Sequence, residues 1–326
     1  MLASGATNWA AQWPRDCPTD GYDPGMDWVR YDRFLPERYH SASAHRPEPT
    51  YWTWKNTSVH IARASRPESK VRVIAVHGAG GYSGLLWPYA AIAAAEGFEV
   101  LCPDLPLYGD TDVPDPSAVR YRDWIDLLCD LVVAEKSKDD RPLILFGASM
   151  GGMLAYEVAH RTALVDRVVA TCLLDPSDPD ARRAAARFAV LGGPAPWLLR
   201  ACAVPAGRVR VPVRWMADMA NMSLNSELST LCAGDTKGGG VRVPVGFLAD
   251  YFGYAHVRPE KYDGPPVLLA HPAEDRWTPP HVSIRFLQRL RAETAIVMLD
   301  GCGHLPVEEP GLTQLADALR SVLKDY

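Results

Sequence analysis

The sequence, 326 residues long, predicts an α/β protein with a mostly parallel central sheet flanked by helices. Short continuous apolar runs, of which residues 143–146 are the clearest, suit parallel strands that are buried on both faces. Segments with apolar residues at helical spacing alternate with these runs, which is the order of a βα chain. Glycine-rich turns directly follow two of the runs, so the chain turns sharply where those strands end.

The composition, 48% hydrophobic and 22% charged, is that of a soluble globular protein. A net charge of −5 gives no general attraction to nucleic acid or to anionic membranes. The seven cysteines are scattered and form no C-x-x-C pair, so we expect free thiols in a reducing cytoplasm, without a disulfide framework or a zinc site. With no signal-peptide pattern and no run of about 20 apolar residues, we predict a cytoplasmic protein without membrane insertion. The sequence carries no signal for the oligomeric state.

Residues 1–50 predict an irregular arm that packs on the body of the protein. The arm is rich in proline and tryptophan, whereas a disordered tail would be depleted in aromatic residues. The expected anchors are Trp28, Tyr31, Phe34 and Leu35. We expect a structural role for this arm; the alternative is that it walls a substrate pocket.

Residues 51–175 predict the first part of the core domain. Alternating residues at 51–64 indicate two antiparallel edge strands joined by a turn at Asn56 and Thr57. The core elements that follow are strands at 71–76, 98–102, 143–146 and 167–174, with helices at 85–96, at 118–133 and directly after residue 149. The second part, residues 259–326, is expected to hold strands at 267–270 and 294–299, a helix at 281–291 and a closing helix over 312–323.

Residues 176–258 do not continue the alternation of strands and helices, and they predict an inserted, mainly helical cap. The segment contains many prolines, helix-like pieces at 180–191 and 215–224, and a flexible glycine run at 238–240. Its large apolar residues predict either a substrate cavity or simply a core for the cap: Trp197, Trp215, Met216, Met219, Met222, Phe247, Tyr251, Phe252 and Tyr254. Residues 178–258 hold ten Lys or Arg and six Asp or Glu, a balance of +4 that indicates a solvated basic surface or attraction of an anionic substrate.

The sequence Gly-Ala-Ser-Met-Gly at 147–151 stands between a predicted strand and a predicted helix. In that setting a G-x-S-x-G motif holds its serine on a strained, exposed turn. The amide of Met150 would lie at the helix N-terminus, where backbone donors are free. The competing interpretation is a glycine-rich turn with an idle serine.

This arrangement resembles the α/β-hydrolase superfamily, in particular its serine esterase, lipase and lysophospholipase-like branch. The resemblance covers residues 70–176 and 260–326 and implies an α/β-hydrolase fold in which the insertion is the cap. It further implies an oxyanion loop upstream of the serine, and an acid and then a histidine downstream. Asp104–Gly109, in the turn Asp-Leu-Pro-Leu-Tyr-Gly, is also similar to the corresponding loop of that superfamily.

A second glycine-rich turn, His-Gly-Ala-Gly-Gly-Tyr-Ser-Gly, follows the strand at 71–76. By its place in the family pattern, the amide of Ala79 would join that of Met150 in an oxyanion hole, with Gly80 as the next candidate. His77 precedes the turn and is expected to be structural. The turn matches neither common nucleotide-binding glycine pattern, so a phosphate loop is disfavoured.

The resemblance assigns a catalytic triad of Ser149, Asp275 and His304. His304 follows the last predicted strand in Gly-Cys-Gly-His, and Asp275 lies in the loop after the preceding strand. His304 would accept the Ser149 proton, and Asp275 would orient the imidazole. Glu274 and Asp175 remain alternative acids.

These features predict a serine hydrolase that cleaves a carboxylic ester with an apolar acyl or alcohol part through an acyl-enzyme, without metal or cofactor. Alternatives on the same triad are a thioesterase, a lactonase or a carbon–carbon bond hydrolase; the alternative of another class is a non-catalytic ligand receptor. The expected partner is a small-molecule ester or related acyl substrate. The residues expected to line its pocket are Tyr82, Tyr108, Trp215, Met219, Trp277 and Leu305.

Overall fold

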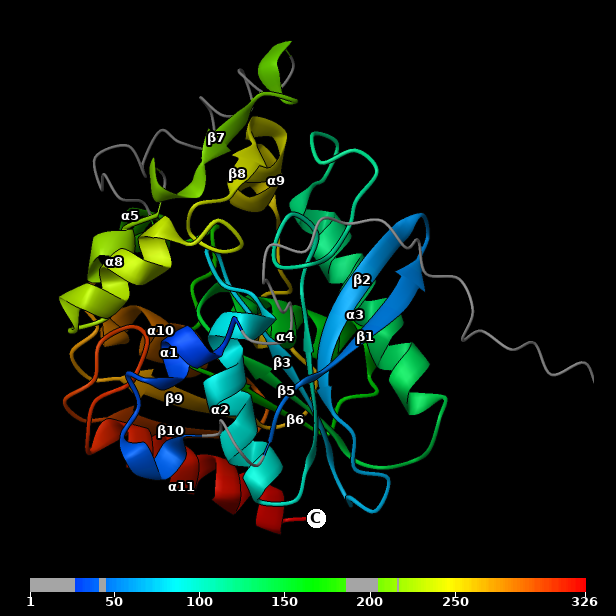
Figure 1. Ribbon diagram of the computed structural model, residues 1–326, viewed down its shortest axis with the longest axis vertical. Helices are drawn as coiled ribbons and strands as arrows, with labels where there is room; N and C mark the ends of the chain where they lie inside the picture. Colours follow the sequence, from blue (N-terminus) through cyan, green and yellow to red (C-terminus); the bar gives the residue numbers. More distant parts are fainter. Residues whose placement is uncertain (1–26, 41–44, 186–204, 216) are drawn as a thin grey trace, which may run out of the picture.

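The computed structural model describes residues 27–40, 45–185, 205–215 and 217–326. Its strands form an eight-stranded sheet in the order β1-β2-β4-β3-β5-β6-β9-β10, with a separate two-stranded ribbon of β7 and β8 (Figure 1). β3, β4, β5, β6, β9 and β10 are parallel, and β1 and β2 join that set as an antiparallel edge. The predicted fold class, a mostly parallel sheet flanked by helices, is therefore confirmed.

The strands are short, and those in the middle of the sheet are buried throughout. Their bounds are β1 Glu48–Trp54, β2 Thr57–Ala64, β3 Arg72–Val76, β4 Glu99–Pro103, β5 Leu143–Gly147, β6 Arg167–Ala170, β9 Val267–Pro272 and β10 Thr294–Leu299. β6 ends four residues before the predicted end of that strand at 174. Pairing with β9 stops at Ala170, and beyond it the amide of Leu173 donates to the Ser283 hydroxyl instead (2.9 Å).

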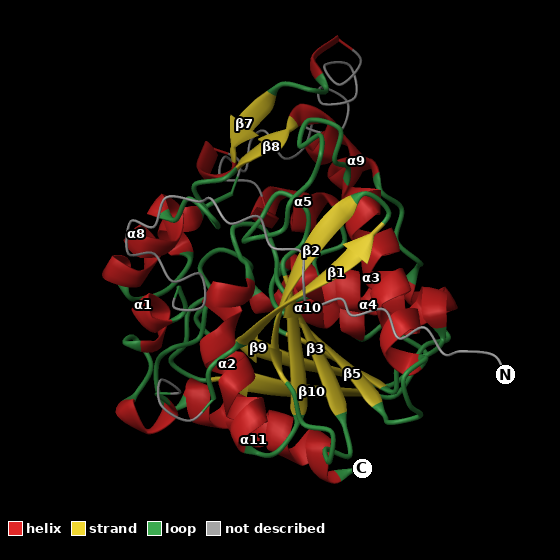
Figure 2. Cartoon of the chain, turned by 45° about the vertical axis from the view of Figure 1, so that its right-hand side comes forward, coloured by secondary structure: helices red, strands yellow, loops and turns green. Residues whose placement is uncertain are grey.

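Two layers of helices cover the sheet (Figure 2). α2 and α11 lie against each other on one face, and α3, α4 and α10 cover the other. The bounds of these helices are α2 Ser83–Ala95, α3 Tyr121–Lys136, α4 Met150–Thr162, α10 Pro280–Leu287 and α11 Gly311–Lys324. No helix in the described ranges is long and apolar enough to cross a membrane.

The structure describes residues 27–40 and 45–50 of the N-terminal arm; the first stretch contains α1 (Val29–Asp32) and η2 (Glu37–Tyr39), and β1 begins in the second. Of its expected anchors, Trp28, Tyr31 and Leu35 are buried, and Phe34 is half-buried. Arg30 donates a hydrogen bond to Asp235, more than 200 residues along the chain (2.6 Å). The described part of the arm is therefore held by both burial and long-range polar contacts.

The connection between β6 and β9 crosses above the carboxyl edge of the sheet (Figure 1). Its described elements are α5 Pro179–Ala185, β7 Arg210–Pro212, η3 Val213–Trp215, η4 Met219–Asn221, α8 Ser226–Gly234, β8 Arg242–Pro244, α9 Val245–Gly253 and η5 Pro259–Lys261. The predicted helix at 215–224 is wrong, because its described residues form only short 3-10 turns. The Ser223 amide donates to the Ser229 hydroxyl (3.0 Å), which replaces a helical backbone hydrogen bond. Of the predicted helix at 180–191, the part after residue 185 lies outside the described residues, as do Trp197 and Met216.

The glycine run at 238–240 is packed tightly, which corrects the expectation of a flexible segment. A Cβ on Gly238 would lie 2.6 Å from the Gly80 carbonyl oxygen, and one on Gly239 would lie 2.4 Å from the Cys232 carbonyl oxygen. Glycine is therefore required here for close approach of two backbones. The contact sets this run directly on the loop that follows β3.

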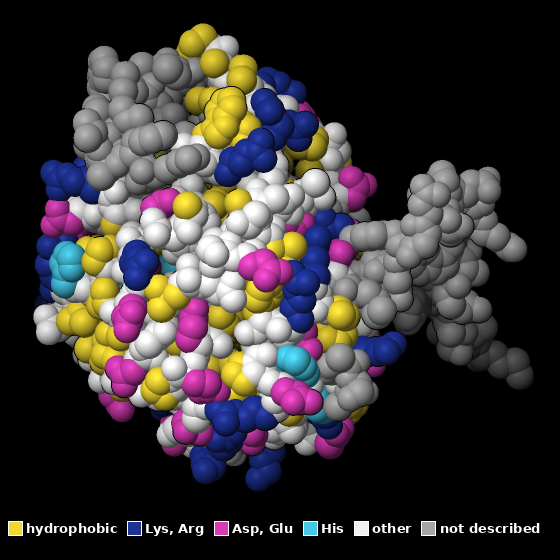
Figure 3. Space-filling model, turned by 60° about the vertical axis from the view of Figure 1, so that its left-hand side comes forward, with side chains coloured by type: hydrophobic (Ala, Val, Ile, Leu, Met, Phe, Trp, Pro, Cys, Tyr) yellow, Lys and Arg dark blue, Asp and Glu magenta, His cyan; other side chains and the backbone are white. Residues whose placement is uncertain are grey.

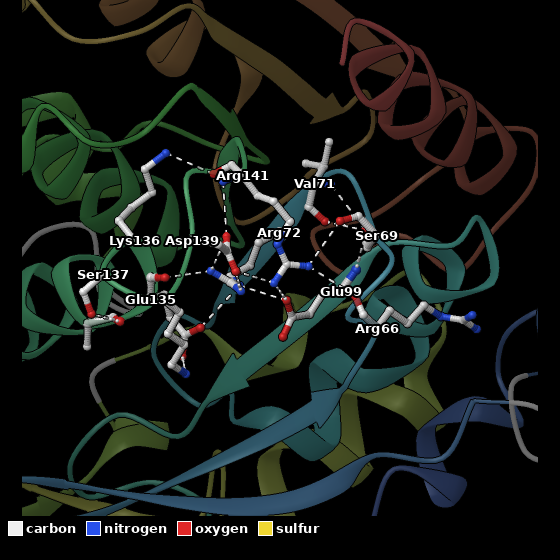
Figure 4. Close-up of polar contacts among 12 residues, drawn as sticks. Arg66, Ser69, Val71, Arg72, Glu99, Glu135, Lys136, Ser137, Asp139 and Arg141 are labelled. Carbon is white, nitrogen blue, oxygen red and sulfur yellow. Dashed lines mark hydrogen bonds and ion pairs between the residues drawn. The ribbon is translucent and has the colours of Figure 1, made fainter.

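A network of buried ion pairs lies at the edge of the sheet where β3 and β4 begin, opposite the carboxyl ends of the strands (Figure 4). Arg72 is 1% exposed and faces its cross-strand partner Glu99, to which its Nε donates (3.0 Å). Its two other nitrogens donate to the Glu135 carbonyl oxygen (2.8 Å) and to the Asp139 carboxylate (2.9 Å). Arg141 also pairs with Glu99 (2.8 Å), so the network ties β3 and β4 to the end of α3.

Replacing Arg72 with methionine is expected to lower the free energy of unfolding by about 3 kcal/mol, because the buried carboxylates of Glu99 and Glu135 would each lose one of the cations that pair with them. Urea unfolding followed by fluorescence measures this change. The matched control is Arg320→Ala, which removes a surface pair with Glu96 and is expected to cost no more than about 1 kcal/mol. Equal losses in the two variants would contradict the assignment of Arg72 as the centre of a buried network.

His256 is buried between α3 and the β6–β9 connection, where its Nε2 lies 3.0 Å from the Tyr121 hydroxyl. Burial lowers the pKa of His256 to about 4, so the folded protein keeps this imidazole neutral. An unfolded histidine titrates near 6.5. Below that pH the unfolded chain takes up a proton that the folded protein does not.

We therefore expect stability to fall as the pH drops from about 6.5 to about 4, with His256 contributing about 3 kcal/mol to the loss. Urea midpoints measured at several pH values should show a weaker pH dependence in His256→Gln than in wild type. The exposed His281→Gln serves as the control. An unchanged pH dependence in His256→Gln would contradict the assignment.

Candidate active site

Ser149 occupies the sharp turn between β5 and α4. Its φ of 55° and ψ of −127° are strained for a residue with a side chain, as expected for a serine held out of a strand-to-helix turn. A Cβ on Gly147 would lie 2.2 Å from the Gly151 carbonyl oxygen, and a Cβ on Gly151 would lie 2.2 Å from that of Val76. The two motif glycines therefore let α4 start close to β5 and β3.

The structure brings Ser149, His304 and Asp275 together from three separate loops. His304 Nε2 lies 2.8 Å from Ser149 Oγ, and His304 Nδ1 lies 2.7 Å from Asp275 Oδ2. A carboxylate can only accept a hydrogen bond, so Nδ1 carries the proton and Nε2 is left to accept the serine hydroxyl. This is the geometry that a serine nucleophile, a base and an orienting acid require.

The carboxylate of Asp275 is held by several donors. The amides of Trp277 and Thr278 donate to Oδ1 (2.9 and 2.8 Å), and the Thr278 hydroxyl donates to Oδ2 (2.6 Å). Burial opposes ionisation, but His304 and these hydrogen bonds lower the pKa of Asp275 to about 2. Asp275 is therefore a fixed negative charge beside the imidazole at neutral pH.

The two alternative acids lie apart from the histidine. Asp175 hydrogen-bonds the amide and hydroxyl of Ser177 (2.8 and 2.6 Å) and lies 3.9 Å from His256 Nδ1. Glu274 is exposed. Of the three carboxylates weighed from the sequence, Asp275 is the one that the structure pairs with His304.

The loop after β3 packs directly against the serine turn. A Cβ on Gly78 would lie 2.8 Å from the Met150 amide nitrogen, so the loop backbone reaches the start of α4 only because Gly78 has no side chain. Gly80, the second oxyanion candidate, has a φ of 77°, and a Cβ on it would lie 2.9 Å from the methyl carbon of Met219. Ala79 lines both cavities that meet at Ser149, described below.

His77 is buried and links this loop to the loop after β4. The Leu105 amide donates to His77 Nε2 (2.9 Å), so Nδ1 carries the proton and donates to the Gly78 carbonyl oxygen (2.9 Å). Asp104 accepts a hydrogen bond from the Ser83 amide at the start of α2 (2.6 Å). These contacts give His77 the structural role expected from its position before the turn.

Two cavities meet at Ser149 from opposite sides. The outer cavity, about 680 Å³ of space that includes some open solvent, lies under the β6–β9 connection. Beside Ala79, Ser149 and Met150, its lining consists of Tyr108, Leu174, Val213, Ala217, Val243, Phe247, Leu248, Tyr251, Phe252, Trp277 and Thr278. The inner cavity, about 510 Å³ by the same measure, runs past His304 and Leu305 toward α2 and α11.

Of the six residues expected to line a pocket, three line these cavities. Tyr108 and Trp277 line the outer cavity, and Leu305 lines the inner one. The other three correct the prediction. Trp215 is 57% exposed, and Met219 is buried against Gly80. Tyr82 faces a different hollow and accepts a hydrogen bond from Arg30 (2.8 Å).

Sequence reasoning missed two hydroxyls that support the site. Thr278 contacts both Asp275 and His304 Nδ1 (3.2 Å), and Thr171 accepts a hydrogen bond from the Ser149 amide (2.9 Å). A threonine three residues after a loop aspartate is a frequent local partner, which could have pointed to Thr278. Thr171 had no local signal, because it reaches Ser149 from β6.

His60 of β2 and two aspartates of the loop after β4, Asp104 and Asp110, lie close enough together to be possible metal ligands. His60 Nδ1 pairs with Asp104 (2.7 Å), and the Lys237 ammonium pairs with Asp110 (2.5 Å). Since a lysine and a histidine already balance these carboxylates, the donor set favours an ion-pair cluster over a metal site.

Comparison with known proteins gives three further findings. The sequence model of the alpha/beta hydrolase family matches residues 73–318. A probable protein phosphatase methylesterase 1 from Caenorhabditis elegans is 32% identical over 102 residues, which cover 31% of this chain and 28% of that relative. The fold is similar to that of a soluble variant of monoglyceride lipase from Saccharomyces cerevisiae (TM-score 0.69, 15% identity, 89% of this chain and 98% of that one). It is also similar to Paleococcus ferrophilus monoacylglycerol lipase (TM-score 0.64, 20% identity, 82% and 99%).

Proposed function

The chain belongs to the alpha/beta hydrolase family, and on that premise we propose that it is a serine hydrolase that cleaves carboxylic esters through Ser149, His304 and Asp275. One observation carries the proposal: a continuous hydrogen-bonded relay from Ser149 Oγ through both ring nitrogens of His304 to Asp275. Family membership supports ester hydrolysis in general. The assignment of the three residues rests on their geometry.

In the proposed reaction, Ser149 Oγ attacks the ester carbonyl carbon while its proton passes to His304 Nε2. The amides of Ala79 and Met150 hold the negative oxygen of the tetrahedral intermediate. The carbon–oxygen bond to the alcohol then breaks, and the alcohol leaves with the proton from His304. Water, activated by the same imidazole, hydrolyses the acyl-enzyme and restores Ser149.

We propose that residues 176–258 act as a cap over the site, with residues 51–175 and 259–326 forming the core and residues 1–50 the arm. The cap supplies the roof of the outer cavity, with Val213, Phe247 and Tyr251 among the residues that line it. An apolar acyl group would be buried there, which excludes water from the serine while the amides act.

A second candidate is a thioesterase with an anionic substrate, in line with the basic balance of the cap. Arg208, Arg210, Arg214 and Arg242 belong to the β7–β8 ribbon and the residues next to it. At this end of the molecule, basic and hydrophobic side chains lie side by side on the surface (Figure 3). Val213 and Val243, which lie in the same short segments, line the outer cavity.

A matched substrate panel tests the proposal: a butanoate ester, the corresponding thioester and a lactone, each with wild type and Ser149→Ala. We expect ester turnover in wild type that is lost in Ser149→Ala. Faster turnover of the thioester would favour the second candidate. Binding without any turnover would favour a non-catalytic receptor and would contradict the proposed function.

A further inference from the structure

The inner and outer cavities differ in which residues of the active site line them. Both cavities touch Ser149 and Ala79, but His304 lines only the inner one, together with Leu305 and Pro306. Trp277 and Thr278 stand on the outer side. The two cavities therefore offer an ester two separate directions away from the serine.

The geometry of the reaction determines which part of the ester lies in each cavity. When the carbonyl oxygen faces the amides of Ala79 and Met150, the acyl group and the leaving oxygen must point to different sides. The leaving oxygen has to lie within hydrogen-bond reach of His304 Nε2, which returns the proton to it. The alcohol part therefore enters the inner cavity, and the acyl part enters the outer cavity.

The inner cavity has little capacity to bind polar groups. Its large apolar lining side chains are those of Leu85, Leu86, Phe146, Met222, Leu305 and Leu315. Of its polar lining residues outside the triad, His77 uses both ring nitrogens and Thr171 accepts the Ser149 amide.

Two polar groups remain: the Thr171 hydroxyl can still donate, and the Tyr89 hydroxyl is buried without a hydrogen-bond partner in the part of the chain that the structure describes. Two free hydroxyls of a polyol, such as those of a glyceryl ester, would find too few partners there.

A third cavity lies next to the inner one. Leu86, Tyr89 and Phe146 line both the inner cavity and a third one, about 490 Å³, between the sheet and helices α2 and α11. Its other lining residues are aliphatic, among them Ala90, Ile144 and Leu319. The surroundings of the inner cavity on this side are therefore apolar as well.

We infer that the inner cavity binds the alcohol part of the substrate and that this part is an alkyl or aryl group, so the preferred substrates are esters that are apolar on both sides of the carbonyl. The inference rests on the proposed function and adds a substrate class to it. It separates this enzyme from one that takes esters of glycerol, where the leaving alcohol is polar.

The first test compares pentyl butanoate with 1-monobutyrin. Both have a butanoyl group and five heavy atoms beyond the ester oxygen, so they differ mainly in the polarity of the alcohol. We expect kcat/KM to be at least tenfold higher for the pentyl ester, because each unpaired buried hydroxyl costs roughly tenfold. Equal or faster turnover of monobutyrin would overturn the inference, whereas absence of any Ser149-dependent turnover would overturn the proposed function itself.

The second test places the same substitution in each cavity. Leu315→Phe narrows the inner cavity, and the control Leu248→Phe narrows the outer one. In Leu315→Phe the ratio of kcat/KM for pentyl over methyl butanoate should fall at least fivefold, whereas in Leu248→Phe it should stay within twofold of wild type. The ratio of kcat/KM for methyl hexanoate over methyl butanoate should fall in Leu248→Phe and stay close to the wild-type value in Leu315→Phe.

If Leu315→Phe does not fold, Leu315→Ala enlarges the same cavity and should raise the ratio of kcat/KM for octyl over pentyl butanoate. The assignment of the two cavities would be overturned if Leu248→Phe changed the preference among alcohols and the Leu315 variants did not.

Discussion

Replacing Ser149 with alanine is expected to lower kcat for ester hydrolysis by about 10⁵- to 10⁶-fold while the protein stays folded. The loss is this large because no other group takes over attack on the carbonyl carbon. The residual rate would come from the oxyanion amides and from binding alone. Steady-state kinetics with a chromogenic ester measure the change.

Thermal unfolding provides the control for this variant. Ser149 Oγ contacts His304, but the turn itself is set by β5, α4 and the glycines on either side, so the unfolding temperature should change little. A variant that is folded and retains more than about a hundredth of the wild-type kcat would show that another group is the nucleophile.

Replacing Asp275 with asparagine is expected to lower kcat by about 10⁴-fold at neutral pH. The carboxylate, whose pKa His304 and the hydrogen bonds hold at about 2 against the opposing effect of burial, stabilises the positive imidazole that forms during attack. An asparagine amide offers no charge and can present its NH₂ group to Nδ1, which favours the wrong tautomer of His304.

Asp175→Asn is the matched control for that variant. Asp175 bonds to Ser177, away from His304, so this substitution should leave kcat within a few-fold of wild type. Activity that survived in Asp275→Asn and disappeared in Asp175→Asn would overturn the acid assignment.

Much of the fold could be predicted from the sequence because its signals are local. The apolar runs of β3 and β5 and the turns that follow them each lie within about ten residues, so period and turn chemistry were sufficient. The closeness of Ser149, His304 and Asp275 followed from the resemblance, since parallel strands place their carboxyl ends at one edge of the sheet.

The cavities could not be predicted, because they depend on packing between distant segments. Trp215 was expected in the pocket on composition alone, but it is exposed at the end of η3, shortly after β7. Leu315 and Tyr89 carry ordinary signals of core helices, yet both line the inner cavity together with His304. The glycine run at 238–240 resembled a linker, but close contacts with the backbones of Gly80, Cys232 and Asp235 explain its lack of side chains.

The central claim is that Ser149 is an activated nucleophile, and intact-mass analysis after exposure to a fluorophosphonate tests it most directly. The account predicts one adduct on the folded wild-type protein and none on Ser149→Ala, with strongly slowed labelling of His304→Ala because the base is missing. Folded wild-type protein that stays unlabelled, or a Ser149→Ala variant labelled as readily as wild type, would contradict it.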